Sequence, residues 1–536
     1  MSEANLLIIA NLVAAQAAAQ PDLDVLTFEN GGEIETRTYR QLWENGQRLA
    51  DALRKLGMAK GERFALLIQN HPEFVELMVA SAILGTVMVP IDPRTRGEKL
   101  AYMLRDSDSL GVICASYSLE GVLEALPDCP DVRWIASVDV LGANHARADL
   151  PVSGHHLKDW LATSLPASLL PVAVESEAEA MQLMYTSGTT GDPKGIVVPH
   201  GRFGAVSGHG EAVFGYRQGD RPYTGLSLTH GNAQFVTLAP SLKMGLRAVI
   251  SRKFSKSRLW DIVRQNGCTT FSLLGGMVTA IHAEPRLDSD ADNPVRLVVS
   301  AGMPLALWED FAERFGVEIF EFYGAMEGGM SIKRPSEGPV GSCGRPAPGL
   351  LARIVDEDGN ESPRGEVGEL QFRLADGPFP PVTYHNNPDA SAKKVVDGWL
   401  LSGDVARMNE DGWIFYEYRK GGGIRRNGEF VSPAFVERVL GEHPGVDDIF
   451  VYGVPTKGGA PGEKDVVAAI VPTASFDPAD LFSWGRAKLE RNMVPSYLHV
   501  VTEIPKTASE KPQERFLIDA FSSGEATILT EQGAET

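Results

Sequence analysis

A glycine- and hydroxyl-rich stretch, YTSGTTGDPKG at residues 185–195, has the composition of a loop that binds phosphate. Glycine allows positive φ angles and brings backbone N–H groups close to a ligand. Ser187, Thr189 and Thr190 add hydroxyl donors, and Lys194 adds an ammonium group. The stretch departs from the Walker pattern GxxxxGK[ST], because its lysine precedes the last glycine and no serine or threonine follows. An ordinary surface loop is the alternative.

Three charged residues further along the chain could act on phosphate or ribose. Glu327 lies in a glycine-flanked turn, where its carboxylate could hold a metal ion. Asp404 ends the apolar run WLLSGD, where it could accept hydrogen bonds from a ribose diol. Lys511 lies in the polar stretch IPKTASEKPQ. Taken singly, each has a plain alternative: a solvated turn glutamate, a turn aspartate after glycine, and a solvated surface lysine.

The elements around the glycine-rich stretch would hold it at the end of a sheet. MQLMY before it is typical of a buried strand, and IVVPH after it resumes an apolar run. Residues 36–115 alternate strands and helices, which predicts parallel strands in doubly wound packing. The expected series is a helix in TYRQLWENGQRLADALRKLG, a strand in RFALLIQN, a helix in PEFVELMVASAILG, a strand in TVMVPID, a helix in RGEKLAYMLRDS and a strand in LGVICAS.

A domain boundary is expected near residues 419–423, where YRKGGGIRRNGEF places three successive glycines between cationic residues. Glycine absorbs large φ/ψ changes, so this run is suited to a hinge. Beyond it, helix and strand patterns form a small unit with its own core. We therefore predict an α/β protein with a large multi-lobed N-terminal domain of doubly wound sheets at 1–420, and a small, mobile α+β C-terminal domain at 421–536.

The composition bounds the class of protein. The chain has 536 residues and a net charge of −20, which argues against binding to nucleic acid or to an anionic membrane. The four cysteines form no CxxC pair, so neither a disulfide framework nor a zinc site is expected, and a cytoplasmic location fits. The apolar run 6–19 predicts a packed helix, and no run is long enough for membrane insertion. Residues 522–536 are expected to form a loose tail.

Together these motifs resemble the adenylate-forming superfamily of acyl-CoA synthetases, peptide-synthetase adenylation domains and luciferases. The phosphate loop, YGxxE at 323–327, GD at 403–404, the arginine-containing hinge and PKT…K at 505–511 follow the order of the acyl-CoA synthetase branch. The resemblance covers roughly residues 10–520. It implies an AMP-forming acid–thiol ligase that uses ATP, Mg²⁺ and coenzyme A, and whose substrate is a small-molecule carboxylic acid. It also implies that the small domain rotates between two half-reactions.

Carried over by position, the resemblance assigns roles to individual residues. The ATP phosphates would be wrapped by Thr186, Ser187, Gly188, Thr189, Thr190 and Lys194. Gly302 and Met303, in SAGMP, would lie along the adenine. Tyr323, followed by Gly324, would stack on the adenine. Asp404 and Arg419 would contact the ribose.

The same resemblance supplies the catalytic roles. Glu327 would hold Mg²⁺ against the phosphates. His230, in LSLTHGNAQ, would lie beside the channel for the acyl group and the thiol. Lys511 would bridge the carboxylate and the α-phosphate during adenylation, and Gly422 falls at the family's hinge position. The acyl pocket would be lined by His230, Asn232, Gln234, Gly302, Met303, Ala325, Met326 and Met330.

Four departures from the family pattern stand out. Met326 replaces the usual threonine and removes a hydroxyl expected near the α-phosphate. Gly422 replaces the usual hinge aspartate or lysine, and Glu510 replaces a glycine. Thr383 and His385 interrupt a run that is commonly Gly-Tyr-Trp. None of these changes removes a charged catalytic group.

The identity of the acid and of the thiol acceptor stays open at this point. GGxIRRxGE is most similar to the branch that contains crotonobetaine/carnitine–CoA ligases. The alternatives are an adenylation enzyme that loads a separate carrier protein, and a catalytically silent relative that serves as a binding or scaffold protein. A homodimer is compatible with the sequence.

Overall fold

The alternating helices and strands predicted for the N-terminal part are present in the computed structural model. α2 (Tyr39–Lys55) begins at a capping box: Gln41 N–H donates to the Thr38 hydroxyl at 3.1 Å, and Thr38 N–H donates to the Gln41 side chain at 2.9 Å. Leu42, Leu49 and Leu53 form its buried stripe. The described residues are 4–138, 150, 154–186, 192–282, 284–356, 358–419, 424–427, 429–431, 433–457, 463–505, 514–524, 526–531 and 533–535.

The first sheet has seven strands, and every neighbouring pair is parallel except β8–β9. In spatial order they are β7 (Gly154–His156), β6 (Trp134–Val138), β5 (Ser109–Ala115), β3 (Arg63–Leu67), β4 (Val87–Pro90), β8 (Ala180–Thr186) and β9 (Lys194–Pro199). The antiparallel β8–β9 pair carries the glycine-rich loop, and Thr186 lies opposite Lys194 at its tip. The β8–β9 pair therefore brings the two flanks of the glycine-rich stretch together at one end of the sheet.

The second sheet has nine strands, with a parallel centre and antiparallel edges. In spatial order they are β16 (Arg345–Pro346), β15 (Gly328–Lys333), β14 (Glu318–Ala325), β13 (Leu297–Ala301), β12 (Thr270–Leu274), β10 (Pro222–Thr224), β11 (Ala248–Ser251), β1 (Asp24–Asn30) and β2 (Glu33–Thr38). One apolar core includes side chains of β1 and β11 from this sheet and of β3 from the first. The two sheets therefore share a buried layer, which α3 (Pro72–Leu84) and α2 help to fill.

A third, antiparallel sheet completes the N-terminal domain and was not foreseen from the sequence. It contains β17 (Leu350–Val355), β18 (Val367–Leu374), β20 (Trp399–Met408) and β19 (Val395–Val396), with β21 (Ile414–Arg419) on β20. The remaining N-terminal helices are α1 (Ile9–Ala19), α4 (Gly97–Asp106), α5 (Ser116–Ala125), α6 (Leu157–Leu161), α7 (His200–Ser207), α8 (His209–Ala212), α9 (Ala239–Met244), α10 (Leu259–Asn266), α11 (Gly275–His282), α12 (Trp308–Phe315) and α13 (Pro388–Ala392). A π-helix, η2 (Ala233–Leu238), precedes α9.

The C-terminal domain is small and of α+β type, as predicted. It has a hairpin, β22 (Ile424–Arg426) and β23 (Glu429–Val431), and a sheet of β24 (Val446–Pro455), β25 (Lys464–Pro472), β26 (Tyr497–Val500), β27 (Thr527–Thr530) and β28 (Gly533–Glu535). Its helices are α14 (Pro433–Gly441), α15 (Pro478–Lys488) and α16 (Glu514–Ser523). The expectation of a loose tail is wrong for β27 and β28, because β27 pairs with β26 and β28 with β27.

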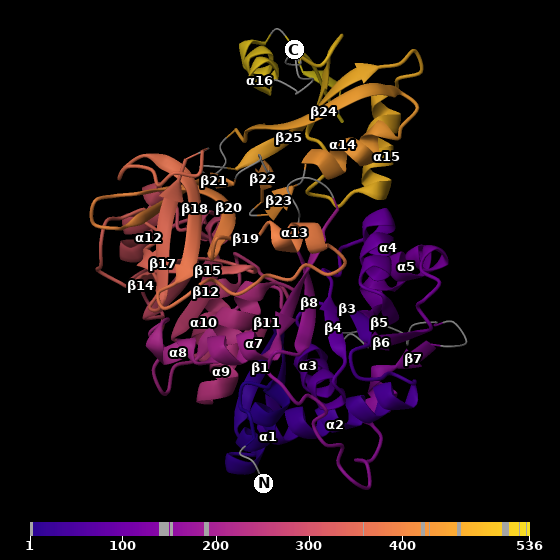
Figure 1. Cartoon of the computed structure of the whole chain (residues 1–536), viewed down its shortest axis with the longest axis vertical. Helices are drawn as coiled ribbons and strands as arrows, with labels where there is room; N and C mark the ends of the chain where they lie inside the picture. The colour runs from indigo at the N-terminus through magenta and orange to yellow at the C-terminus, as the bar shows by residue number, and fades with distance from the viewer. Residues whose placement is uncertain are drawn as a thin grey trace.

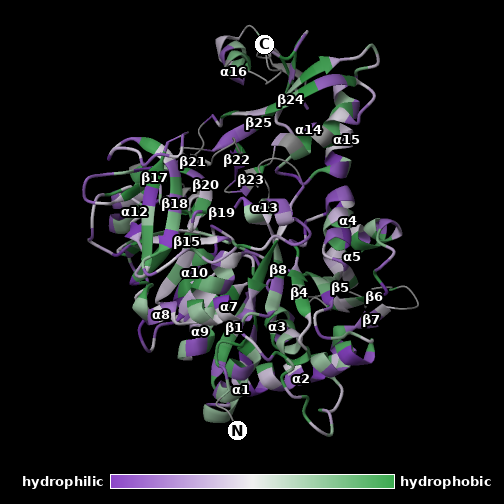
Figure 2. Cartoon of the chain, viewed as in Figure 1, coloured by the Kyte–Doolittle hydropathy of each residue, from purple (hydrophilic) through white to green (hydrophobic). Residues whose placement is uncertain are grey.

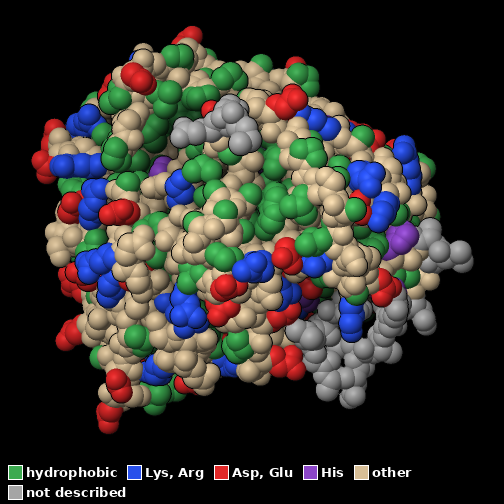
Figure 3. Space-filling model, turned by 90° about the horizontal axis from the view of Figure 1, so that it is seen from below, with side chains coloured by type: hydrophobic (Ala, Val, Ile, Leu, Met, Phe, Trp, Pro, Cys, Tyr) green, Lys and Arg blue, Asp and Glu red, His purple; other side chains and the backbone are tan. Residues whose placement is uncertain are grey.

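The arrangement of the two domains places the hairpin at their boundary. Figure 1 shows β24, β25 and α15 above the N-terminal domain, with β22 and β23 on the side that faces it. Apolar residues concentrate along the strands, as Figure 2 shows, and polar residues on the outer turns. On the face drawn in Figure 3, acidic and basic side chains are interspersed, so this face does not present a basic stripe. None of the described helices combines the length and apolar composition that a membrane crossing requires.

Candidate active site

Two predicted nucleotide contacts, Tyr323 on β14 and Asp404 on β20, come together in the structure. The Tyr323 hydroxyl donates a 2.5 Å hydrogen bond to Oδ2 of Asp404. The tyrosine ring is stacked on Phe372, with centroids 6.0 Å apart and planes inclined by 11°. Asp404 is buried, and its backbone lies opposite that of Arg419. A ring and a carboxylate held side by side match the needs of an adenosine site.

Glu327 occupies a tight turn four residues beyond Tyr323. Ala325 pairs with Gly328 across β14 and β15, which leaves Met326 and Glu327 in the turn. Gly328 has a φ of 124°, and a Cβ there would lie 2.5 Å from the Phe379 ring. The hairpin therefore fixes the position of Glu327 in space relative to Tyr323.

The carboxylate of Glu327 is buried among groups suited to phosphate chemistry. Tyr384 donates a 2.8 Å hydrogen bond to its Oε1, and Lys394 Nζ lies 3.7 Å from the same oxygen. Lys194 Nζ lies 5.8 Å from the centroid of the Tyr384 ring. The structure thus places Lys194 over the ring of the tyrosine whose hydroxyl binds Glu327. Tyr384 and Lys394 were not identified from the sequence.

Backbone hydrogen bonds hold the unusual run at 383–385, and the His385 side chain adds a 3.3 Å contact with Asp108. Val197 N–H donates to the Thr383 carbonyl at 3.0 Å, and His385 N–H donates to the Gly195 carbonyl at 2.8 Å. These bonds make no demand on the two side chains, which explains how Thr383 and His385 are accommodated. Because they bracket Tyr384, they aim its hydroxyl at Glu327. His385 also lines a cavity of about 260 Å³ beside Lys194.

A third unpredicted residue, Arg202 on α7, binds the backbone of the glutamate turn. Its guanidinium donates to the carbonyl of Met326 and, at 2.9 Å, to that of Ala325. Burial lowers the pKa of Arg202 to about 10, and the negative charge of Glu327 opposes that shift. Its position after His200, in PHGRF, carried no motif that could have identified it from the sequence.

The loop at Gly302 and Met303 is fixed by a buried carboxylate from the next strand. Gly302 N–H donates to Glu321 Oε1 at 2.6 Å, and Met303 N–H donates to the same oxygen at 3.2 Å. Burial raises the pKa of Glu321 to about 8, against the opposing effect of these hydrogen bonds. The predicted adenine loop therefore lies beside β14, at Glu321, two residues before Tyr323.

The predicted acyl-pocket residues differ in their surroundings. His230 is 61% exposed, and its Nε2 lies 3.9 Å from Asp92. Asn232 has a buried Oδ1 without a hydrogen-bond partner in the described ranges. Gln234 is fully buried, and its amide bonds Gln182 and the Leu228 carbonyl. The substrate-binding roles of these residues remain predictions.

Met326 and Met330 flank the glutamate turn. A Cβ added to Gly231 would lie 2.3 Å from the Met326 sulfur, so this methionine packs against the segment that carries His230. Met330 is partly buried on β15, opposite Gly324. Methionine fills irregular apolar space, so both side chains are suited to an acyl-facing wall.

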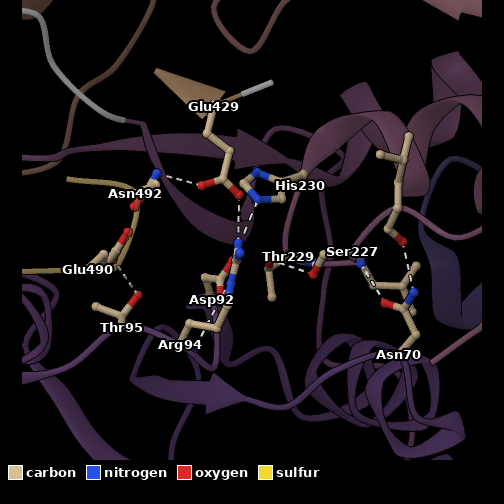
Figure 4. A network of polar contacts seen from close by, with 12 residues as sticks. Asn70, Asp92, Arg94, Thr95, Ser227, Thr229, His230, Glu429, Glu490 and Asn492 are labelled. Carbon is tan, nitrogen blue, oxygen red and sulfur yellow. Dashed lines mark hydrogen bonds and ion pairs between the residues drawn. The ribbon is translucent and has the colours of Figure 1, made fainter. Parts of the chain in front are cut away.

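Polar contacts cross from the N-terminal domain to the C-terminal domain beside His230. Arg94 binds Asp92 at 2.7 Å and Glu429 of β23 at 2.6 Å, and Asn492 donates to Glu429 at 2.6 Å (Figure 4). Lys99 of α4 lies 2.7 Å from Glu490. Burial alone would raise the pKa of Asp92, but Arg94 outweighs it and holds that pKa below its usual value. These contacts hold the hairpin β22–β23 against the His230 side of the site.

Several predicted site residues lie outside the described residues. They are Ser187, Gly188, Thr189, Thr190, Gly422 and Lys511. Arg419 ends β21, and its backbone lies opposite that of Asp404, the other residue predicted to contact the ribose.

The donor set beside the turn fits a magnesium ion. Mg²⁺ is usually bound through one or two carboxylates, with water and substrate phosphates completing the shell. Glu327 supplies one buried carboxylate next to Lys394 and Lys194, where anionic phosphates would also be attracted. In the described part of the chain, no group of three or more His, Cys, Asp or Glu is arranged as a metal cage. The arrangement therefore suits a metal that arrives with a nucleotide.

Family models match both domains of the chain. The model for AMP-binding enzymes covers residues 13–376, and the model for the C-terminal domain of AMP-binding enzymes covers residues 436–511. The first match spans β14 and the Glu327 turn, whereas Asp404 lies between the two matched ranges.

Curated relatives align along almost the whole chain. A fatty acid–[acyl-carrier-protein] ligase, ScoC, of Streptomyces coeruleorubidus is 31% identical over 91% of this chain and 92% of its own. A crotonobetaine/carnitine–CoA ligase of Salmonella heidelberg is 29% identical over 92% and 96%.

Solved structures share the fold. The o-succinylbenzoate CoA synthetase of Bacillus subtilis, in a double-mutant form with the product analogue OSB-NCoA, matches with a TM-score of 0.79, 23% identity, and coverage of 95% of this chain and 98% of that one. The same synthetase in complex with AMP gives a TM-score of 0.64 at 23% identity, with coverage of 94% and 96%. From the matched family models, the aligned relatives and the shared fold, the chain belongs to the AMP-binding enzymes, the adenylate-forming superfamily that its motifs resemble.

Proposed function

We propose that this protein is an AMP-forming carboxylate–CoA ligase that makes an acyl-adenylate from ATP and a carboxylic acid. One observation carries the proposal: a single hairpin, β14–β15, holds Tyr323 against Asp404 and, four residues later, Glu327 against Tyr384 and Lys394. An adenosine-type pair and a phosphate-type group on one hairpin suit a nucleoside triphosphate.

In this proposal, the Tyr323–Asp404 pair binds the nucleoside end of ATP. Asp404 accepts hydrogen bonds from the ribose hydroxyls, because its buried carboxylate already accepts one from Tyr323 and keeps further acceptor capacity. Phe372 backs the Tyr323 ring, so the ring is held ready to stack on the adenine. Glu321 keeps Gly302 and Met303 along the same base.

The phosphates would extend from this pair toward Glu327. Lys194 and Lys394 attract the anionic phosphates, and Tyr384 fixes the orientation of the Glu327 carboxylate. When bound, Mg²⁺ would neutralise phosphate charge at Glu327. The substrate carboxylate attacks the α-phosphorus, and pyrophosphate leaves with its electron pair. Lys511 is proposed to meet the negative charge that develops in this step.

The second half-reaction needs an open path for a thiol to the acyl carbon. We place that path beside His230, which is exposed and next to Met326 through Gly231. The thiolate attacks the acyl carbon, and AMP departs as the leaving group. The ion pair between Arg94 and Glu429 of β23 holds the hairpin β22–β23 next to this path.

The observed domain arrangement suits the thiol step. The o-succinylbenzoate CoA synthetase of Bacillus subtilis matches this chain with a TM-score of 0.79 in its OSB-NCoA form and 0.64 in its AMP form. This supports an arrangement of the domains like that of the analogue-bound form. We propose a boundary between residues 420 and 421 with Gly422 as its pivot, and a C-terminal domain that rotates to bring Lys511 in for adenylation.

A carrier-protein thiol is the second candidate acceptor. The relative ScoC is named a fatty acid–[acyl-carrier-protein] ligase and aligns over 91% of this chain, so its name favours testing this acceptor. Homodimer formation and a cytoplasmic location remain predictions from the sequence.

The function is tested by pyrophosphate release across a panel of carboxylic acids. Release that depends on acid and ATP, with turnover that rises on adding CoA, supports the ligase. Turnover only with a phosphopantetheinylated carrier protein would favour the second candidate. If none of the acids in the panel gave pyrophosphate release, a catalytically silent protein would be favoured.

A further inference from the structure

Arg202 lies between three elements that meet at the glutamate turn. It is the third residue of α7, the helix that directly follows β9 and Lys194. Its guanidinium carbon lies 5.7 Å from the centroid of the Phe235 ring on η2. Its other contacts are the carbonyls of Met326 and Ala325. One side chain therefore links α7, the π-helix η2 and the turn that carries Glu327.

The two carbonyls contacted by Arg202 immediately precede Glu327. Backbone carbonyl groups that are shielded from water need a donor, and Arg202 supplies one to each of these part-buried carbonyls. Arginine offers two parallel N–H groups in a rigid fork, which suits two successive carbonyls. On the far side of the turn, Gly329 packs against Phe372, where a Cβ would lie 2.5 Å from the ring. The turn is thus held from both ends.

Glu327 lies close enough to Arg202 for its negative charge to favour the protonated guanidinium. The Met326 side chain has no hydroxyl. Arg202 therefore contacts this residue through its backbone carbonyl.

We propose that Arg202 is a positioning residue for Glu327, and that it sets the affinity of the nucleotide site for Mg²⁺. The inference rests on the proposed function, because it assigns Glu327 to the metal. Arg202 acts through the backbone of the turn, by fixing the carbonyls of Ala325 and Met326 beside Glu327.

The test measures the Mg²⁺ concentration that half-saturates pyrophosphate release, in Arg202→Gln and Arg202→Lys. Removing a charged donor pair should raise that concentration about tenfold in Arg202→Gln, and by roughly threefold in Arg202→Lys, which keeps the charge without the fork. Thioester formation from supplied acyl-adenylate and CoA should stay within about twofold of the unaltered protein, because that step needs no metal at the turn. This second reading also reports that each variant is folded.

Arg221 is the matched control. It is a partly buried arginine that donates to a backbone carbonyl, that of Arg247, and burial lowers its pKa as well. Arg221→Gln should leave the Mg²⁺ dependence unchanged. An unchanged Mg²⁺ dependence in both Arg202 variants would overturn the proposal, and so would an equal loss of both half-reactions. If the unaltered protein released no pyrophosphate, the proposed function would fail instead.

Discussion

The hydroxyl of Tyr384 donates a 2.8 Å hydrogen bond to Oε1 of Glu327, although the two residues are 57 positions apart. Glu327 lies in the turn between β14 and β15, and Tyr384 lies between β18 and α13. Tyr384→Phe removes that donor and keeps the ring beside Lys194. A hydrogen bond to a charged group is worth about 1.5–3 kcal/mol, so kcat/KM for ATP should fall roughly 10- to 100-fold. Steady-state kinetics at saturating acid would measure the change.

Tyr452 offers the control for this substitution. Its hydroxyl lies 2.7 Å from Nδ1 of His499 in the C-terminal domain, away from the nucleotide. Tyr452→Phe should leave kcat/KM for ATP unchanged. Equal effects of the two substitutions on kcat/KM would contradict a specific role for the Tyr384–Glu327 bond.

The stability of the protein should depend on pH through Glu321. Burial raises the pKa of Glu321 from 4.5 to about 8, so between these values the folded protein holds a proton that the unfolded chain has released. The free energy of unfolding should therefore fall as the pH rises through this interval, by up to about 1.4 kcal/mol per pH unit. Glu321→Gln should remove this slope. Urea unfolding at several pH values tests it, and an unaltered slope in the variant would refute the assignment.

The ion pair between Lys99 and Glu490 should favour the observed domain arrangement. Both side chains are mostly buried, so this pair should matter more than the exposed Arg94–Glu429 pair. Lys99→Met should slow thioester formation from supplied acyl-adenylate by roughly 3- to 10-fold and leave adenylation within about twofold. Lys256→Met breaks a pair within the N-terminal domain, with Glu284, and should affect neither half-reaction. Slower adenylation in Lys99→Met would contradict this assignment.

Lys511 should serve adenylation alone. Loss of a preorganised partner for developing charge costs about 10²- to 10³-fold in rate, so Lys511→Ala should lose adenylation by at least that factor. It should still convert supplied acyl-adenylate and CoA into the thioester. Lys506→Ala is the control, and adenylation lost in that variant but kept in Lys511→Ala would show that the motif is aligned in the wrong register.

The sequence was most informative where local patterns determine structure. The helical spacing of the leucines in α2 predicted that helix, and the resemblance to the family predicted that Tyr323 and Asp404 lie close together. Arg202 and Tyr384 were missed for a common reason. Each reaches the glutamate turn from a distant segment, 124 positions away for Arg202 and Met326, and 57 for Tyr384 and Glu327. Tyr384 lies in the run compared with the family's Gly-Tyr-Trp pattern, but only its neighbours Thr383 and His385 were singled out there.

Tail strands were missed because their pattern is short and polar. Residues 527–530 and 533–535 alternate weakly, and their pairing depends on the edge that β26 offers. The antiparallel sheet of β17–β21 was also missed, although β17 pairs with β18 and β20 with β21, the strands that follow them in the chain.

The central claim is that the carboxylic acid becomes an acyl-adenylate, and isotope transfer tests it most directly. An acid labelled with heavy oxygen in its carboxylate is incubated with the protein, ATP, Mg²⁺ and CoA, and the nucleotide product is analysed by mass spectrometry. Attack of the carboxylate on the α-phosphorus, followed by attack of the thiol on the acyl carbon, should leave one labelled oxygen in AMP, with pyrophosphate unlabelled. Formation of ADP with the label in inorganic phosphate would contradict the account.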